Sequence, residues 1–294
     1  MSANVGAEDR IGGYRYVRTL QMGQNSVIME VAQESSGKRF AMKQLLASKA
    51  GDSAERKVFE FEAKLGMQLK HPQLIRVYEF VRDKEQPYFV MDYFPGITLR
   101  LVIGRPQDHA LPKGRAHFVL EQSAAGLAYM HEQGWTHRDI KPENILVNKG
   151  GEARVIDYAL AKRIPTGLGK LFSGKPPREG THSYLAPEVI MREPPSAQAD
   201  IYSFGITCYE LACGRQPFRA NSPSELLTKH MRERPSPPTV HNKAITPEFS
   251  DLVMSMIQKR PADRLGNLRE FLSKFSKIRI YQDDPEPSPD RGFR

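Results

Sequence analysis

The 294-residue chain is short of cysteine, of tryptophan and of long apolar stretches. Its two cysteines, Cys208 and Cys213, stand five residues apart and would point to different sides of a helix, which excludes a shared metal site and an easy disulfide between them. Unpaired cysteines suit a reducing compartment, so we expect a cytoplasmic location. No run of about eighteen apolar residues occurs, which excludes a transmembrane helix in this chain. Residues 1–9 lack the basic and apolar regions of a signal peptide.

Acidic residues are also outnumbered, because 34 Asp and Glu face 43 Lys and Arg and leave a net charge of +9. A solvated basic surface is the simplest interpretation, and attraction to ATP, to acidic proteins or to an anionic membrane is the alternative. The basic residues do not alternate with aromatic residues along one face, so we expect no nucleic-acid partner. Apolar residues at 39% and charged residues at 26% are ordinary for a globular chain with room for two lobes.

Strand patterns and helix patterns occupy different parts of the chain. Strands are expected at 14–20, 27–32, 39–46, 74–81 and 88–93, with one helix at about 53–70 between them. After Pro95-Gly96, helices are expected at 115–133, at 199–213, which is apolar nearly all round, and from Ser222, Thr246 and Leu268 onward. We therefore predict an α+β fold made of an N-terminal extension (1–13), a small β-rich lobe (14–93), a larger helical lobe (94–276) and a disordered tail (277–294).

The most informative segment is His137-Arg138-Asp139-Ile140-Lys141-Pro142-Glu143-Asn144. Within it, Asp139 can accept a proton from a hydroxyl group, and Lys141 can neutralise a moving phosphate. Asn144, together with Asp157 at the end of the apolar run Val155-Ile156, offers the hard oxygen ligands that Mg²⁺ prefers. These are the groups that phosphoryl transfer from a metal-bound nucleotide requires.

The segment resembles the catalytic loop of the eukaryotic-type (Hanks-type) protein kinases. Phe40-Ala41-Met42-Lys43 resembles their V-A-I-K strand, and Ala186-Pro187-Glu188 resembles their A-P-E motif. The placing of Lys141 and the pair Gly180-Thr181 favour the serine/threonine branch, and the compact helical lobe is most similar to bacterial members. The resemblance covers about residues 14–276 and implies the two-lobed protein kinase fold.

For catalysis, the resemblance implies ATP and Mg²⁺ as cofactors. Asp139, Lys141, Lys43 and Glu62 are the implied catalytic residues, and Asn144 and Asp157 are the implied metal ligands. Lys43 would contact the α- and β-phosphates and pair with Glu62, for which Glu60 is the competing candidate.

For nucleotide binding, the implied residues come from the glycine-rich loop, the neighbouring strands, the hinge and the floor of the adenine site. They are Gln21, Gly23, Ser26, Ile28, Ala41, Lys43, Met91, Asp92, Phe94 and Leu146. The family also implies ion pairing between Glu188 and Arg264, and Asp200 and Gly205 match its D-x-x-x-x-G helix.

Three departures from the family pattern stand out. Only Gly23 remains of the glycine-rich loop, since Gln21 and Ser26 replace glycines, and we expect weaker nucleotide binding. The metal-binding segment begins with Asp157 but continues Tyr158-Ala159 in place of Phe-Gly.

The usual phosphorylation site of the activation loop is Pro177, which cannot be phosphorylated. Thr166 and Ser173 remain as alternatives, and Glu179 could act as a permanent negative charge for Arg138.

We therefore expect a serine/threonine protein kinase that transfers the γ-phosphate of Mg-ATP to protein hydroxyls, with autophosphorylation left open. The alternative is a pseudokinase or nucleotide-binding scaffold, which the degraded glycine-rich loop favours. A small-molecule kinase is disfavoured by the segment 180–188, which builds a peptide platform in the family. Glu143 suggests substrates with a basic residue, whereas the cations between Lys162 and Arg178 suggest acidic partners, so substrate preference and oligomeric state stay open.

Overall fold

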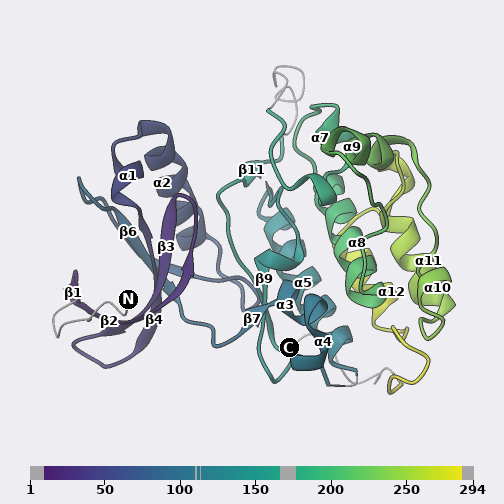
Figure 1. Ribbon diagram of the computed structural model, residues 1–294, viewed down its shortest axis with the longest axis horizontal. Helices are drawn as coiled ribbons and strands as arrows, with labels where there is room; N and C mark the ends of the chain where they lie inside the picture. Colours follow the sequence, from purple (N-terminus) through teal and green to yellow (C-terminus); the bar gives the residue numbers. More distant parts are fainter. Residues whose placement is uncertain (1–9, 110, 113, 166–176, 287–294) are drawn as a thin grey trace. The chain divides into compact units, whose positions relative to one another are not determined.

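The computed structural model describes residues 10–109, 111–112, 114–165 and 177–286, and the chain divides into two compact units between Pro95 and Gly96 (Figure 1). The first unit is a six-stranded antiparallel sheet in the order β1-β2-β3-β4-β6-β5 with two helices. Its elements are β1 (Arg10–Ile11), β2 (Tyr14–Met22), β3 (Ser26–Gln33), β4 (Arg39–Leu45), α1 (Ala47–Ala50), α2 (Ser53–Gln68), β5 (Val77–Val81) and β6 (Tyr88–Asp92).

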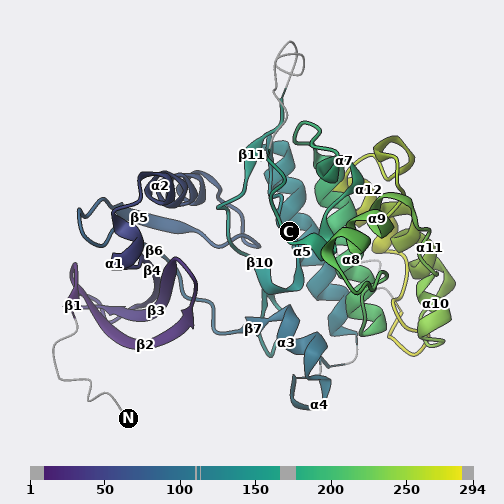
Figure 2. The same ribbon diagram turned by 45° about the horizontal axis from the view of Figure 1, so that its top comes forward.

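The strands of the first unit place successive side chains on opposite faces of the sheet, as the period of a strand requires. Alternate residues of β3 and β4, among them Val31 and Met42, form one apolar cluster with the start of β2 and with β6. On the other face, Phe59 and Ala63 of α2 pack against the sheet at Phe89, and α2 lies along β5 (Figure 2). The helix begins where the Asp52 carboxylate accepts hydrogen bonds from two backbone amides of the first turn.

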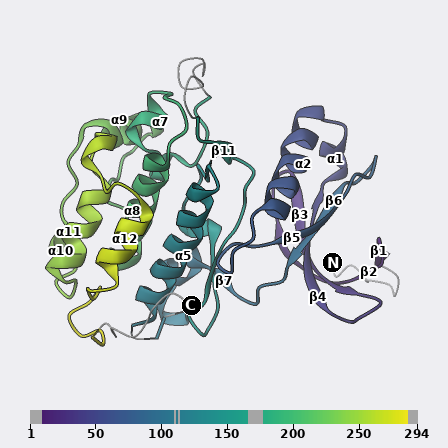
Figure 3. The same cartoon turned by 180° about the vertical axis from the view of Figure 1, so that it is seen from behind.

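The second unit is mainly helical (Figure 3). Its α-helices are α3 (Leu99–Gly104), α4 (Pro106–His109), α5 (Arg115–Glu132), α7 (Pro187–Ile190), α8 (Ala197–Cys213), α9 (Pro223–Arg232), α10 (Pro238–His241), α11 (Pro247–Met256) and α12 (Leu268–Phe275). Short 3₁₀ turns are η1 (Pro142–Asn144), η2 (His182–Tyr184) and η3 (Pro261–Asp263). A sheet β10-β9-β7 and a pair β11-β8 are made of β7 (Ile97–Thr98), β8 (Trp135–Thr136), β9 (Ile145–Val147), β10 (Ala153–Val155) and β11 (Lys162–Arg163).

Helix α8 is the buried centre of the second unit, as its apolar sequence predicts. It contacts α5 and α11, and Gly205 permits the close approach at the end of α11. A Cβ atom at Gly205 would lie 2.7 Å from Ile257 Cγ2 and 2.8 Å from Met256 Cβ, so a larger residue would force these elements apart. The predicted helix starts at Ser222 and Thr246 are confirmed, because each hydroxyl accepts a backbone hydrogen bond from the first turn.

The prediction of a disordered tail from residue 277 is wrong for residues 277–286. Ile280 is only 1% exposed, and its carbonyl accepts a 2.9 Å hydrogen bond from the Thr246 amide. The Asp284 carboxylate accepts a 3.0 Å hydrogen bond from the backbone amide of Gly114, just before α5. The polar composition of this segment gave no sign of these contacts, because they are made by buried backbone groups and by one buried carboxylate. The remainder of the predicted tail, 287–294, lies outside the described residues.

At the other end, residues 10–11 of the predicted extension pair with the start of β2 and belong to the first unit's sheet. Within the described residues, no helix combines the length and the apolarity needed to cross a bilayer.

Candidate active site

In the first unit, Lys43 on β4 and Glu62 on α2 form an ion pair. Lys43 Nζ lies 2.7 Å from each oxygen of the Glu62 carboxylate, and the two side chains are 14% and 6% exposed. Charges removed from water to this extent need such a partner. The competing candidate, Glu60, instead pairs with Lys64 at 2.8 Å and with Arg82. The structure therefore pairs Lys43 with the glutamate that the sequence placed first.

The sequence-predicted nucleotide residues of the central strands share one face of the sheet with Lys43. Ile28 is the cross-strand partner of Lys43, and Ala41 is the partner of Met91. Since residues two apart on a strand point to the same side, these four side chains lie on the face opposite the cluster of Val31 and Met42.

Three other predicted nucleotide residues lie elsewhere. The Asp92 carboxylate accepts hydrogen bonds from the Tyr78 hydroxyl at 2.6 Å and from the Arg76 amide at 3.2 Å. Phe94 is half-buried just beyond β6, and Leu146 lies on β9 of the second unit.

The degraded glycine-rich loop forms a tight turn between β2 and β3. The Gly23 amide donates to the Ser26 carbonyl at 2.8 Å, and a Cβ atom at Gly23 would lie 3.0 Å from that oxygen. Asn25 Nδ2 donates to Glu55 Oε2 of α2 at 3.0 Å, which fixes the tip of the turn. Gln21 is exposed near the end of β2, and Ser26 is half-buried at the start of β3. A side chain at position 23 would therefore press against the backbone of the turn.

In the second unit, Asp200 on α8 holds the backbone of the loop that carries Asp139. Its carboxylate accepts hydrogen bonds from the His137 amide at 2.7 Å and from the Arg138 amide at 2.8 Å, and His131 Nε2 lies 2.8 Å away. Burial alone would raise the pKa of Asp200, but the hydrogen bonds and charges of these histidines outweigh it and hold the pKa below its ordinary value. The loop can then adopt a positive φ of 70° at Arg138, which is unfavourable for a residue with a side chain.

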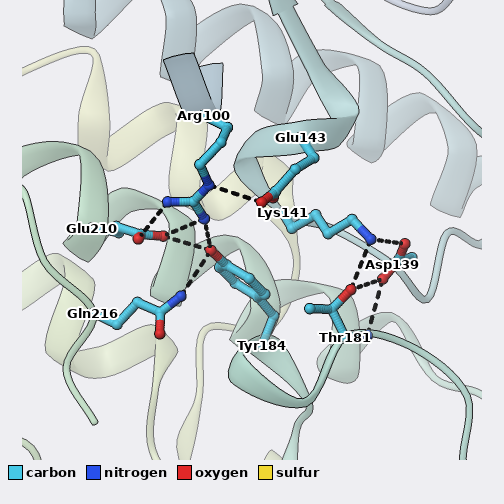
Figure 4. A network of polar contacts seen from close by, with 8 residues as sticks. All are labelled: Arg100, Asp139, Lys141, Glu143, Thr181, Tyr184, Glu210 and Gln216. Carbon is cyan, nitrogen blue, oxygen red and sulfur yellow. Dashed lines mark hydrogen bonds and ion pairs between the residues drawn. The ribbon is translucent and has the colours of Figure 1, made fainter. Parts of the chain in front are cut away.

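The predicted catalytic side chains of this loop meet at Asp139 (Figure 4). Asp139 Oδ1 accepts hydrogen bonds from the Thr181 amide at 3.1 Å and from its hydroxyl at 3.0 Å. Lys141 Nζ lies 2.6 Å from Asp139 Oδ2 and donates to the Thr181 hydroxyl at 2.7 Å. Asn144 Nδ2 donates to the backbone and side-chain oxygens of Asp139, at 2.8 and 3.1 Å. The structure thus brings together a carboxylate, a cation and an amide at one point.

One backbone hydrogen bond brings the two predicted metal ligands, Asn144 and Asp157, to neighbouring positions. The Ile156 amide donates to the Asn144 carbonyl at 3.0 Å, at the end of the β9–β10 ladder, and Asp157 is the next residue. Because the Asn144 amide nitrogen is committed to Asp139, its side-chain oxygen is the atom left for a cation. In the described residues, no group of three or more His, Cys, Asp or Glu side chains could hold a metal. One amide and one carboxylate fit Mg²⁺, which takes few protein ligands and completes its shell with water and phosphate.

The segment before Gly180 supplies the counter-charge of Arg138. Arg138 Nη1 lies 2.8 Å from Glu179 Oε2, and the arginine side chain is buried. Thr166 and Ser173, the alternative phosphorylation sites, lie outside the described residues.

Sequence reasoning missed one polar cluster beside this loop, made of Arg100, Tyr184 and Glu210 together with Glu143 (Figure 4). Arg100 precedes Glu143 by 43 residues and Glu210 by 110 residues, so no local spacing signals the contact.

Comparison with known proteins gives a consistent result. The sequence profile of the protein kinase domain matches residues 14–275. The chain is 30% identical over 253 residues to the "Serine/threonine-protein kinase PknB" of Mycolicibacterium smegmatis, and 32% identical over 266 residues to the "Probable serine/threonine-protein kinase SCO3848" of Streptomyces coelicolor. These alignments cover 85% and 89% of this chain, and 40% and 39% of the relatives. The chain therefore spans about two fifths of the length of these curated relatives.

Proposed function

Because the chain belongs to the protein kinase domain family, we propose that it is a serine/threonine protein kinase, which transfers the γ-phosphate of ATP to hydroxyl groups of proteins. The observation that carries the proposal is the cluster in which Asp139 is held by Thr181, Lys141 and Asn144. Phosphoryl transfer uses a proton acceptor, a cation and a metal ligand of this kind, whereas a scaffold gains nothing from retaining them together.

In this mechanism, Asp139 orients the acceptor hydroxyl and takes its proton. The Thr181 amide and hydroxyl hold Oδ1 of Asp139 in place, so the carboxylate needs no reorientation during the reaction. Lys141, bound to both residues, places a positive charge where the transferred phosphoryl group carries negative charge.

Two further groups of residues are proposed to bind ATP and its cation. Lys43, oriented by Glu62, contacts the phosphates, and the face of the sheet that carries Ile28 and Ala41 contacts the base. Asn144 and Asp157 hold Mg²⁺, which neutralises phosphate charge when it is bound.

The proposal also covers the class of substrate. We propose protein substrates with serine or threonine acceptors, because Thr181 lies beside Asp139 and the similar proteins are named serine/threonine-protein kinases. Two free cysteines in the described chain support a reducing location such as the cytoplasm.

The test is transfer of labelled phosphate from ATP to a generic protein, in the presence of Mg²⁺, by wild-type protein and by Asp139→Asn. We expect the substitution to lower the rate by about a hundredfold or more, because it removes the proton acceptor. Asp263→Asn, an exposed carboxylate on η3, is the matched control and should keep the wild-type rate. Equal rates in wild type and Asp139→Asn, or binding of ATP without any transfer, would support the scaffold alternative.

A further inference from the structure

Arg100 of α3 is held by two carboxylates and a phenol (Figure 4). Its Nε lies 2.8 Å from Glu143 Oε1, and its Nη1 and Nη2 lie 2.7 and 3.2 Å from the two oxygens of Glu210. Nη2 also donates to the Tyr184 hydroxyl, which donates to Glu210 at 2.6 Å. One guanidinium therefore occupies a site built from two acids, and the three charged groups together carry a net charge of −1.

The site is buried at its base and open at its rim. The Glu210 side chain is 6% exposed, whereas Arg100 and Glu143 are 31% and 43% exposed. Burial opposes the charge of Arg100, but its hydrogen bonds to Glu210 and Glu143 raise the arginine pKa above its ordinary value. A cation is thus strongly favoured here, and it is reachable from solvent.

Two elements of this cluster, the loop of Glu143 and η2 with Tyr184, also build the acceptor site proposed above. Glu143 follows Lys141 by two residues in the same loop, and Tyr184 ends η2, which starts directly after Thr181. Figure 4 shows the Arg100 cluster and the Asp139 cluster side by side along this loop. A peptide whose serine reaches Asp139 advances about 3.3 Å per residue, so a long side chain close to that serine in sequence can reach the rim.

We propose that Arg100 is a specificity-determining residue that fills this acidic site from within the chain. A basic residue near the acceptor serine then finds both carboxylates already paired with Arg100, and the one negative charge left over is too weak to make the enzyme select such substrates. This inference rests on the proposed function and answers the conflict in the sequence, where Glu143 alone suggests basic substrates. Removal of the guanidinium leaves two acids at the rim and base, which would bind the arginine of a substrate.

The test compares peptides that carry one serine and a single arginine, moved through each position from four before to four after the serine, with an all-alanine reference. We expect kcat/KM ratios near one for the wild-type protein at every position. Arg100→Ala should raise the ratio at one or two positions by about tenfold or more, mainly through a lower KM, because a charge-assisted hydrogen bond is gained. Arg100→Lys, which keeps a cation, and Arg269→Ala, which removes an exposed ion pair with Glu132, should keep the wild-type pattern.

Two results would overturn the proposal. One is a strong preference of the wild-type protein for arginine at these positions. The other is an equal loss of kcat/KM for all peptides in Arg100→Ala, which is the result expected if Arg100 only joins α3 to α8. Should Arg100→Ala fail to fold, Arg100→Gln keeps the side-chain stem without the charge and decides the question with the same peptides.

A second readout does not need catalysis. Millimolar ethylguanidinium should raise the melting temperature of Arg100→Ala but not that of the wild-type protein, and tetramethylammonium, which has no hydrogen-bond donor, should raise neither. If no variant transfers phosphate to any peptide, the proposed function fails while this experiment still decides whether the acidic site exists. No rise with ethylguanidinium would refute the site.

Discussion

Two arginines of the second unit bind acids in different surroundings. Arg264 makes a bidentate pair with Glu188, at 2.6 and 2.8 Å, and the two side chains are 0% and 3% exposed. Its remaining donors reach the carbonyls of Gln198, Gln258 and Lys259. Arg100 makes three hydrogen bonds to two carboxylates and is less enclosed, since its side chain is 31% exposed and that of Glu143 is 43% exposed. The buried Arg264–Glu188 pair joins distant segments of the chain. The Arg100 cluster does the same but also leaves charged side chains partly exposed to solvent.

The difference between the two sites is tested most directly by removing each guanidinium in turn. Arg264→Met should lower the free energy of unfolding by about 3–5 kcal/mol, because Glu188 is left buried without a counter-charge. Arg100→Met should cost less, about 1–3 kcal/mol, because Glu143 is 43% exposed and buried Glu210 keeps the hydrogen bond from the Tyr184 hydroxyl. Urea unfolding followed by circular dichroism measures both values. Equal costs would mean that exposure at the rim does not matter and would remove the contrast.

The surroundings of the buried Arg264–Glu188 pair should also respond to acid. Arg264 stacks on the ring of Tyr202, 4.9 Å from its centroid, and the Tyr202 hydroxyl lies 2.9 Å from His230 Nδ1. Burial, reinforced by the charge of Lys259, lowers the pKa of His230 from 6.5 to about 3. The unfolded chain therefore binds a proton that the folded chain excludes, and stability falls as the pH drops from 6.5 toward 3.

His230→Asn keeps a polar group beside Tyr202 but does not titrate. Its melting temperature should fall less steeply than that of the wild-type protein between pH 6.5 and about pH 4, which differential scanning fluorimetry can follow. His182→Asn, which replaces an exposed histidine on η2, serves as the control for removal of a histidine. Parallel curves of melting temperature against pH for wild type and His230→Asn would show that His230 does not cause the loss of stability in acid.

The smallest effect of a substitution is expected at a third arginine, Arg138, whose ion pair is more exposed than that of Arg264 and less exposed than that of Arg100. Arg138 is buried, but its partner Glu179 is 29% exposed and sits directly before Gly180. We expect Glu179→Gln to lower kcat by about tenfold, since the charge that joins this segment to the Asp139 loop is lost. Glu179→Asp should recover part of the rate. Phosphatase treatment should leave the wild-type rate unchanged, and a large loss after treatment would show that a phosphate performs this task instead.

The sequence predicted the elements whose pattern is local and left out those that depend on distant partners. The long helix α5, the capped starts of α9 and α11, and the strands of the first unit follow from periodicity and capping residues. The ordered segment 277–286 was missed because its stability comes from Thr246 and Gly114, far back in the chain.

The same distinction holds for the candidate active site. Spacing places Asp139, Lys141 and Asn144 in one loop, and the structure brings Thr181 onto them. Which glutamate would pair with Lys43 was open between two residues on one helix, and packing of α2 decides for Glu62. The Arg100 cluster could not be predicted, since charge pairs between distant residues leave no periodic pattern in a sequence.

Helix α2 carries two attachments that the sequence presents as unrelated. Glu55 holds the tip of the β2–β3 turn through Asn25, and Glu62, seven residues later, holds Lys43. Seven residues make about two helical turns, so both carboxylates emerge from the same side of α2. A rotation of this one helix would release Lys43 and loosen the turn in a single motion. Any partner that binds α2 and rotates it would therefore change the position of Lys43 and of the β2–β3 turn together.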